Sequence, residues 1–138
     1  MKIIVNGCFD LFHDGHKYIL GIACNWADKG ELLILLNSDY SVKELKGENR
    51  PINNENTRRY NITQFCRQFY PKTCIAIAPF STEEELSKYI DEYKPDMIIK
   101  GNDRPDVRDI IGSKNWPVCI IPRLKKDGKE ISTSNLIL

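Results

Sequence analysis

Short apolar runs alternate with segments of helical period along the whole chain of 138 residues. Five of these runs have the length and the leucine, isoleucine and valine content of β-strands. They cover residues 2–6, 32–37, 73–78, 97–100 and 118–121. The second run holds an unbroken stretch of leucine and isoleucine at 32–36, which is typical of a central strand covered on both faces.

Three helices are expected between these strands, because apolar residues recur there at positions i, i+3, i+4 and i+7. The three sets are Ile19, Ile22, Ala23 and Trp26; Ile62, Phe65, Cys66 and Phe69; and Leu86, Tyr89, Ile90 and Tyr93. Gly30, Pro71 and Pro95 follow the three sets in turn, where each would end its helix. Ser81 and Glu84 have the spacing of a capping box at the start of the third helix.

This alternation predicts an α/β fold, a Rossmann-like three-layer sandwich around a five-stranded, mostly parallel sheet. Two shorter helices are expected over residues 107–112 and 133–138. The sequence shows no repeat, low-complexity tract or linker, so residues 1–138 are expected to form one domain. Ligands of open parallel sheets bind at the carboxyl ends of the strands. Four polar stretches fall at that edge, at 7–16, 37–53, 100–109 and 123–134.

The composition excludes several classes of protein. With 41% hydrophobic and 28% charged residues, the chain is expected to fold rather than to be disordered. A net charge of +1 gives no overall field that would attract nucleic acid or an anionic membrane. The sequence shows neither a secretory signal nor an apolar stretch of about 18 residues. The five cysteines form no Cys-x-x-Cys motif, and we expect reduced thiols in a cytoplasmic protein.

Both histidines lie in one short stretch, GCFDLFHDGH at 7–16, directly after the first expected strand. A strand, a glycine-containing turn and a helix start form an anion-binding corner in α/β proteins, because backbone N–H groups and the helix dipole point there. His13 and His16 are three residues apart and share a face if the helix has begun. Gly7 allows a tight exit from the strand, and Gly15 removes a side chain where a phosphate must approach. The pair is therefore expected to donate hydrogen bonds to charge that develops on phosphorus.

Three other interpretations of this corner fit its residues less well: a known phosphate-binding fingerprint, a zinc site and a cysteine nucleophile. The stretch matches neither the G-x-G-x-x-G dinucleotide fingerprint nor a P-loop, so the corner is built differently. A structural zinc would need two further ligands, and the chain has no other histidine. Cys8 is disfavoured as a nucleophile, since direct attack by a phosphate needs none. Asp14 is a candidate cap of the helix that follows.

The pattern G-x-F-D-x-x-H-x-G-H, present here as GCFDLFHDGH, resembles the signature of the cytidylyltransferase-like nucleotidyltransferases at every fixed position. Within that family the chain looks most like the heptose 1-phosphate adenylyltransferases, which make ADP-heptose. The features that carry this likeness are VNGCFD, NSDYSVKELKG, RPIN with Arg58 eight residues after Arg50, IIKGND, IIGSK and ISTSN. Glycerol-3-phosphate cytidylyltransferases share the histidine motif, a lysine in the second loop and a similar C-terminal segment, and they are the alternative.

The resemblance implies an enzyme that transfers a nucleoside monophosphate, AMP from ATP, to a sugar 1-phosphate such as heptose 1-phosphate, with release of pyrophosphate. It implies that the catalytic residues are His13, His16, Lys46 and Arg58. It implies nucleotide-binding roles for Gly7, Cys8, Phe9, Asp10, Gly15, Lys100, Gly101, Asp103, Ile131, Ser132 and Thr133. It implies substrate-binding roles for Asn37, Asp39 and Arg50.

The cations of this set lie in the second polar stretch and in the helix after it. Flexible lysines and forked guanidinium groups neutralise phosphates in different ways. Arg58 lies early in its expected helix, where it could point back to the histidine corner, whereas the adjacent Arg59 lies on another face. Asn102 stands where near relatives have glycine, and this departure from the family pattern leaves the nucleotide open. LKKDGKE separates Arg123 from Ile131, a second departure, so the family role of this arginine is not carried over to Arg123.

The resemblance further implies Mg²⁺ bound mainly through the nucleotide phosphates, because the sequence shows no carboxylate cluster that would form a metal cage. The expected partners are a nucleoside triphosphate and a phosphorylated sugar or polyol, without nucleic acid or membrane. The resemblance also implies a homodimer, because the family is commonly dimeric, and Trp26 or Trp116 is expected to be an exposed contact residue of the dimer. A non-catalytic nucleotide-binding module is a third hypothesis, although such a module has no need of transition-state donors.

Overall fold

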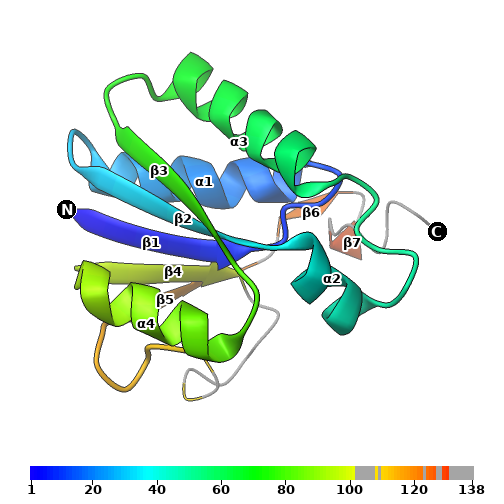
Figure 1. The fold of residues 1–138 in the computed structure, drawn as a ribbon. Helices are drawn as coiled ribbons and strands as arrows, with labels where there is room; N and C mark the ends of the chain where they lie inside the picture. Colours follow the sequence, from blue (N-terminus) through cyan, green and yellow to red (C-terminus); the bar gives the residue numbers. More distant parts are fainter. Residues whose placement is uncertain (102–107, 109, 123, 127–128, 131–138) are drawn as a thin grey trace.

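The computed structural model describes residues 1–101, 108, 110–122, 124–126 and 129–130. Its elements in chain order are β1 (Lys2–Gly7), α1 (Asp14–Ala27), β2 (Glu31–Asn37), α2 (Asp39–Lys46), α3 (Glu55–Phe69), β3 (Cys74–Phe80), α4 (Glu83–Tyr93), β4 (Met97–Gly101), β5 (Val118–Ile121), β6 (Lys125–Lys126) and β7 (Lys129–Glu130) (Figure 1). The helix expected over 133–138 lies outside the described residues. Of the helix expected over 107–112, residues 110–112 form a bend and a turn instead.

Strands β1 to β5 form one sheet in the order β3-β2-β1-β4-β5, and every neighbouring pair is parallel. The expected five-stranded sheet is therefore confirmed. The chain runs outward from β1 through β2 to β3 and then returns to the other side of β1 with β4. The sheet order reverses between β1 and β4, and ligands of such sheets bind at this switch point beyond the carboxyl ends of the strands. The histidine corner follows β1 directly, so it lies at this point.

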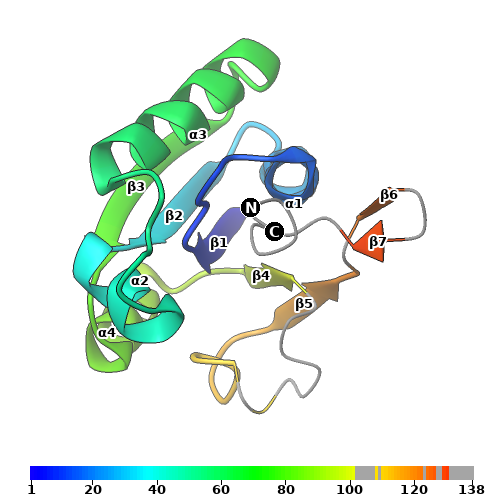
Figure 2. The same ribbon diagram turned by 90° about the vertical axis from the view of Figure 1, so that its right-hand side faces the viewer.

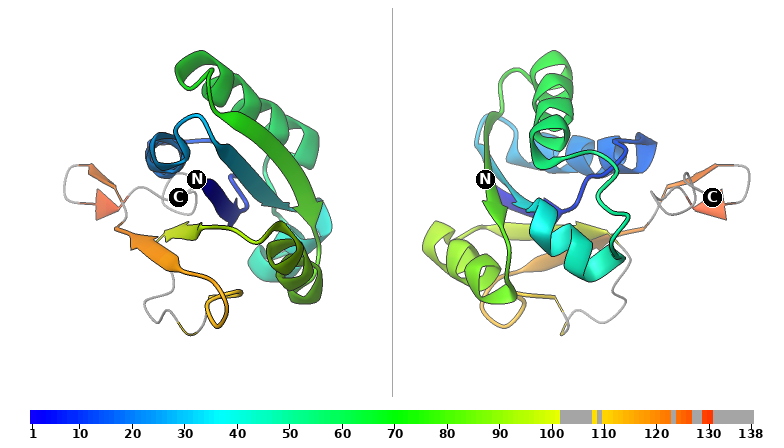
Figure 3. Two further views of the ribbon diagram at one scale, coloured as in Figure 1. Left: turned by 90° about the vertical axis from the view of Figure 1, so that its left-hand side faces the viewer. Right: turned by 45° about the vertical axis from the view of Figure 1, so that its right-hand side comes forward.

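Helices cover both faces of the sheet, which confirms the three-layer sandwich (Figures 1 and 2). Alternate residues of β1 point to opposite faces. Ile3 and Val5 join the core under α1 and α3, whereas Ile4 joins the core under α4. The continuous apolar run in β2 divides in the same way, as the pattern predicts for a strand buried on both sides. Figure 3 shows that α2 stands apart from these layers, beyond the carboxyl ends of β1 and β2.

Helix α2 corrects the expectation of a polar loop. Only Ser41 and Val42 are buried among its residues, so its sequence carries no apolar stripe of helical period. Ser38 caps it by accepting a hydrogen bond from the Ser41 N–H at 3.2 Å. What makes this segment helical is the cap and its anchoring to the end of β2, and a periodicity search detects neither.

Two expected caps lie one residue away from the observed ones. Thr82, not Ser81, caps α4, because its Oγ1 accepts from the Glu85 N–H at 3.1 Å. The Ser81 hydroxyl is instead hydrogen-bonded to that of Ser38, at 2.7 Å between the two oxygens. His13, not Asp14, caps α1. A hydroxyl was the right class of cap for α4, whereas an imidazole and not a carboxylate caps α1, because neighbouring polar residues compete for the same position.

The two tryptophans differ in their surroundings. Trp26 on α1 is 41% exposed, in keeping with the expected anchor. Trp116 is not an exposed anchor, because it packs against the core under α4 and its Nε1–H donates to Asp91 Oδ1 at 2.9 Å. In the described part of the chain, no helix is long and apolar enough to cross a membrane.

Candidate active site

The turn after β1 is tight and held by one carboxylate. Phe9 and Leu11 have left-handed backbone conformations, with φ of 53° and 49°, which cost about 1–2 kcal/mol for each non-glycine residue. Asp10 between them is fully buried. Its Oδ1 accepts from the N–H groups of Leu11 (3.1 Å) and Asn53 (2.8 Å), and its Oδ2 from Ile52 N–H (2.8 Å) and Arg50 Nε–H (3.2 Å). Burial alone would raise the pKa of Asp10, but these hydrogen bonds and the Arg50 charge outweigh it and lower that pKa.

The two histidines cap α1 reciprocally. His13 Nδ1 accepts from the N–H groups of Gly15 (3.1 Å) and His16 (3.4 Å), while His16 Nδ1 accepts from the N–H of His13 (3.2 Å). The rings stack with their centroids 3.6 Å apart, so the expectation that they share a face is confirmed. Because a backbone N–H can only donate, both Nδ1 atoms must be unprotonated. Each neutral ring therefore carries its proton on Nε2, and the Nε2 atom of His13 is buried.

The surroundings of His16 keep it neutral. Burial lowers the pKa of His16 from 6.5 to about 3, a proton on His13 would act in the same direction, and the charge of Asp10 opposes both. Phe9 and Phe12 flank the ring, with centroids 5.2 and 5.9 Å from that of His16. At neutral pH this imidazole is a fixed hydrogen-bond donor and not a proton reservoir.

Four cations from separate segments of the chain act on Cys8, which precedes the histidine pair in the turn after β1. Burial raises the pKa of the Cys8 thiol, whereas the charges of Lys46, Arg58, Lys100 and Arg50 each lower it. Lys46 ends α2, and Lys100 lies at the carboxyl end of β4, where its Nζ also donates to the Asn6 carbonyl at 3.3 Å. Each of these cations thus lies near enough to Cys8 to act on its charge, and Cys8 belongs to the same turn as the histidine pair.

Arg58 points to the corner, but its guanidinium is fully buried. Its Nε–H donates to Asn53 O at 2.9 Å, its Nη1 to Cys8 O and Asn37 O at 2.8 Å each, and its Nη2 to Asp39 Oδ1 at 2.8 Å. The resemblance implied a phosphate contact, whereas these donors face protein acceptors. The neighbouring Arg59 turns elsewhere, toward the Ile77 carbonyl and Glu55.

The remaining expected residues have mixed surroundings. Asn37 is buried and its Nδ2 donates to Ser41 Oγ at 3.2 Å, which fastens α2 to β2. Asp39 is half-exposed beside it. A Cβ at Gly7 would lie 3.3 Å from the Phe9 ring, and one at Gly101 would lie 3.2 Å from Ile19 Cδ1, so both glycines allow close packing. The expected site residues outside the described part are Asp103, Ile131, Ser132 and Thr133.

Residue-by-residue assignment missed Asn53. Its N–H donates to Asp10 and its carbonyl accepts from Arg58, so it joins the two buried networks. The RPIN sequence at 50–53 was the signal that could have found it. An interaction through the backbone leaves no mark on residue type, which is why the side-chain chemistry of this stretch pointed only to Arg50.

The described residues contain no group of three or more histidine, cysteine or acidic side chains that could hold a metal ion. Asp10 already accepts four hydrogen bonds, and Asp39 accepts one from Arg58. Mg²⁺ bound through nucleotide phosphates stays a prediction.

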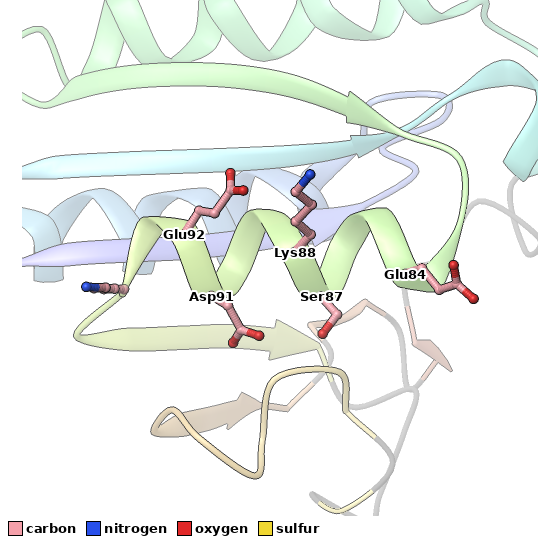
Figure 4. Close-up of a pocket in the computed structure, with 6 residues that line it drawn as sticks. Glu84, Ser87, Lys88, Asp91 and Glu92 are labelled. Carbon is pink, nitrogen blue, oxygen red and sulfur yellow. The ribbon is translucent and has the colours of Figure 1, made fainter.

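A shallow, open depression lies on the outer surface of α4, on the other side of the sheet from α1 (Figures 1 and 4). It is lined by Glu84, Ser87, Lys88, Asp91, Glu92 and Lys94, all from α4 or its end. The side chains point outward in different directions and converge on no common point (Figure 4). This surface therefore has none of the convergent geometry of the histidine corner.

Comparison with known proteins agrees with this geometry. Residues 4–138 match the cytidylyltransferase-like family, and the chain belongs to that family. The enzyme class expected from the sequence, a nucleotidyltransferase, is the class that this family defines.

The chain is 39% identical over 113 residues to "Bifunctional protein HldE" of Haemophilus influenzae (strain PittEE). The matched residues are 81% of this chain and 21% of that protein. It is 35% identical over 136 residues to the protein of the same name from Helicobacter pylori (strain G27), covering 98% and 26%. The chain thus spans about a quarter of the length of these relatives.

Two solved structures resemble the fold. The lipopolysaccharide core biosynthesis protein from Thermoplasma volcanium GSS1 superposes with a TM-score of 0.65 at 25% identity, covering 92% of this chain and 98% of that one. The universal stress protein from Archaeoglobus fulgidus in complex with dAMP superposes with a TM-score of 0.60 at 16% identity, covering 87% and 96%. The second likeness concerns the fold alone.

Proposed function

We propose that this chain transfers AMP from ATP to a sugar 1-phosphate such as heptose 1-phosphate and releases pyrophosphate. One observation carries the proposal: two stacked, neutral imidazoles with Nε2–H donors lie at the switch point of a parallel sheet, beside a gathering of cations. Such an arrangement suits an anion whose charge grows during the reaction.

In the proposed reaction an oxygen of the acceptor phosphate attacks the α-phosphorus of the triphosphate in line. The bond from the α-phosphorus to the bridging oxygen breaks, and pyrophosphate leaves with the electron pair. His13 and His16 would donate to the α-phosphate and to that bridging oxygen, and Lys46 would lie between the two reacting phosphates. Since the imidazoles are oriented by the backbone before substrate arrives, little reorganisation is needed in the transition state.

Mg²⁺ would screen the triphosphate charge, held through phosphate oxygens and water. Lys100, at the end of β4, would take part in binding the nucleotide across the switch point from the histidines. Asp39 is the one half-exposed acidic group beside Asn37 and is the candidate for contact with acceptor hydroxyls. Asp10 organises the corner from within, because it accepts hydrogen bonds from Leu11, Arg50, Ile52 and Asn53.

The choice of acceptor rests on likeness. The sequences NSDYSVKELKG, IIKGND and ISTSN resemble heptose 1-phosphate adenylyltransferases, and the curated relatives are HldE proteins. The structural neighbour from Thermoplasma volcanium is described as a lipopolysaccharide core biosynthesis protein, which suits an acceptor of the sugar phosphate class. A glycerol-3-phosphate cytidylyltransferase remains the competing assignment on the histidine motif alone.

A pyrophosphate-release screen tests the proposal. Each of ATP, CTP, GTP and UTP is combined with heptose 1-phosphate, other sugar 1-phosphates and glycerol 3-phosphate. The proposal expects the fastest release with ATP and heptose 1-phosphate, and loss of that release in His16→Ala. Faster release with CTP and glycerol 3-phosphate would replace the assignment by the alternative. Triphosphate binding without release on any acceptor would support a non-catalytic module instead.

A further inference from the structure

Two buried arginines, Arg50 and Arg58, hold the short loop that precedes α3 through hydrogen bonds. Arg50 donates to Asp10, and the backbone of Asn53 is held on both sides, its N–H by Asp10 and its carbonyl by Arg58. Arg58 also donates to Asp39 at the start of α2. We call these five residues the arginine bracket. The bracket ties together the β1–α1 corner, the start of α2 and the loop that precedes α3.

Burial of the Arg58 guanidinium in this bracket costs free energy. A guanidinium loses its hydration when it is enclosed, and the effective penalty is several kcal/mol for each buried ion. Arg58 is 0% exposed, and its carboxylate partner, Asp39, is half-exposed. Three of its four acceptors are backbone carbonyls, those of Cys8, Asn37 and Asn53. An apolar side chain would fill this volume without that penalty but would fix none of the three carbonyls in place.

The bracket has a direct consequence for Lys46. This residue ends α2, a helix with few core contacts of its own, since only Ser41 and Val42 are buried in it. The chain on both sides of Lys46 is anchored to the bracket, through Asp39 before it and Arg50 after it. The Asn37–Ser41 hydrogen bond fastens the start of α2, whereas Asp39 and Arg50 tie the chain before and after Lys46 to the bracket. The place of Lys46 relative to Cys8 therefore depends on those two anchors as well.

We infer that Arg58, together with Asp39, is a positioning residue that sets Lys46 against the histidine pair, and that it is not itself a ligand of the phosphates. The inference rests on the proposed nucleotidyl transfer for its kinetic consequence, and on the described contacts alone for its structural one. In this inference Lys46 and Lys100, whose amines end flexible side chains, neutralise the phosphate charge. The Arg58 guanidinium only holds the surrounding backbone in place.

Arg58→Lys and Arg59→Lys form a matched pair for the kinetic test. Both change an arginine to lysine at neighbouring positions of α3, but only the first removes contacts to the corner. A displacement of about 1 Å can cost about 10²-fold in rate. We expect kcat of Arg58→Lys to fall by about 10- to 100-fold with the KM for triphosphate changed by less than about threefold, and Arg59→Lys to behave like wild type. A phosphate ligand would give the reverse pattern, a raised KM with kcat largely retained, and that result would overturn the inference.

Amide hydrogen exchange gives a readout that does not depend on turnover. In Arg58→Lys, and in the milder Asp39→Asn should the first variant fail to fold, the amides of residues 39–53 should exchange at least about tenfold faster, while those of Arg59→Lys should not. This acceleration would stand even if no acceptor were ever found, so it separates failure of the bracket from failure of the proposed function. Unchanged exchange over 39–53 in a folded variant would refute the positioning role.

Discussion

The histidine corner and the outer face of α4 both carry many charged and polar groups, and they use them in opposite ways. In the corner, Asp10 and Arg58 are fully buried, and their partners come from segments far apart in the sequence. On α4, the groups around the depression belong to one helix and point apart (Figure 4). The charged groups of the corner are surrounded by protein dipoles and charges, whereas those of the α4 face are exposed to solvent.

The difference shows which polar residues the fold has to position. Exposed charges contribute about 0–1 kcal/mol each and tolerate change, because solvent replaces a lost partner. Buried ones leave an unsatisfied group when a partner is lost, and they hold neighbouring atoms in a fixed geometry. The α4 depression is open to solvent, whereas hydrogen-bond donors and buried charges converge in the corner.

The largest expected effect is on turnover. His16→Ala removes one Nε2–H donor from the corner, and loss of one transition-state donor costs about 10²–10³-fold in kcat. Lys88→Ala removes a charge from the α4 depression and should leave kcat within about twofold, since surface changes of this kind are nearly neutral. Steady-state pyrophosphate release from both purified variants measures the contrast. Near-normal turnover of a folded His16→Ala protein would remove the histidines from the mechanism.

The next effect is on stability. Asp10→Asn replaces one carboxylate oxygen by an amide nitrogen, so either Leu11 and Asn53 or Arg50 and Ile52 lose their acceptor, at about 1–3 kcal/mol for each unpaired donor. Glu92→Gln on α4 is the control and should change the free energy of unfolding by less than about 0.5 kcal/mol. Urea denaturation followed by circular dichroism compares the two. Equal midpoints for both variants would mean that the corner is not held by Asp10.

Much of the fold was predictable because it depends on patterns that survive in sequence. All five strands of the sheet and α1, α3 and α4 were found from apolar periodicity. Helix α2 was not, because its position comes from a serine cap and from polar anchors to β2. The end of β3 at Phe80, beyond the expected residue 78, follows pairing with Asn37 of β2 across Pro79, a residue that argues against a strand.

The positions of several candidate site residues could be predicted from the sequence, whereas the contacts of Arg58 could not. The spacing of His13 and His16 was enough to predict a shared face, and Arg58 was rightly distinguished from Arg59 as the one that points to the corner. The burial of Arg58 could not be foreseen, since a charged residue on a helix is normally solvated. Its four acceptors include three backbone carbonyls, and backbone groups are the same at every position in a sequence.

A smaller effect is the pH dependence of stability. The pKa of His16 falls from 6.5 in the unfolded chain to about 3 in the folded one, so only the unfolded chain takes up that proton between these values. Stability from this group is complete above pH 6.5 and declines as the pH falls toward 3. The lowered pKa of Asp10 adds its own loss only below its usual 3.8. Unfolding curves at about pH 7 and pH 5 should therefore differ less in His16→Asn than in wild type; an equal difference would contradict the neutral, buried imidazole.

The central claim, that cations and imidazoles meet at one anion-binding corner beside Cys8, is tested most directly by the reactivity of that thiol. Cys74 is exposed at the start of β3 and provides a control in the same molecule. Rates of modification by an anionic and a cationic methanethiosulfonate are followed for each cysteine by peptide mass spectrometry, with and without ATP.

We predict that the anionic reagent is favoured at Cys8 relative to Cys74, that Lys46→Met weakens this preference, and that ATP protects Cys8 while leaving Cys74 unprotected. The same charge preference at both thiols, with no protection of Cys8 by saturating ATP, would contradict the account.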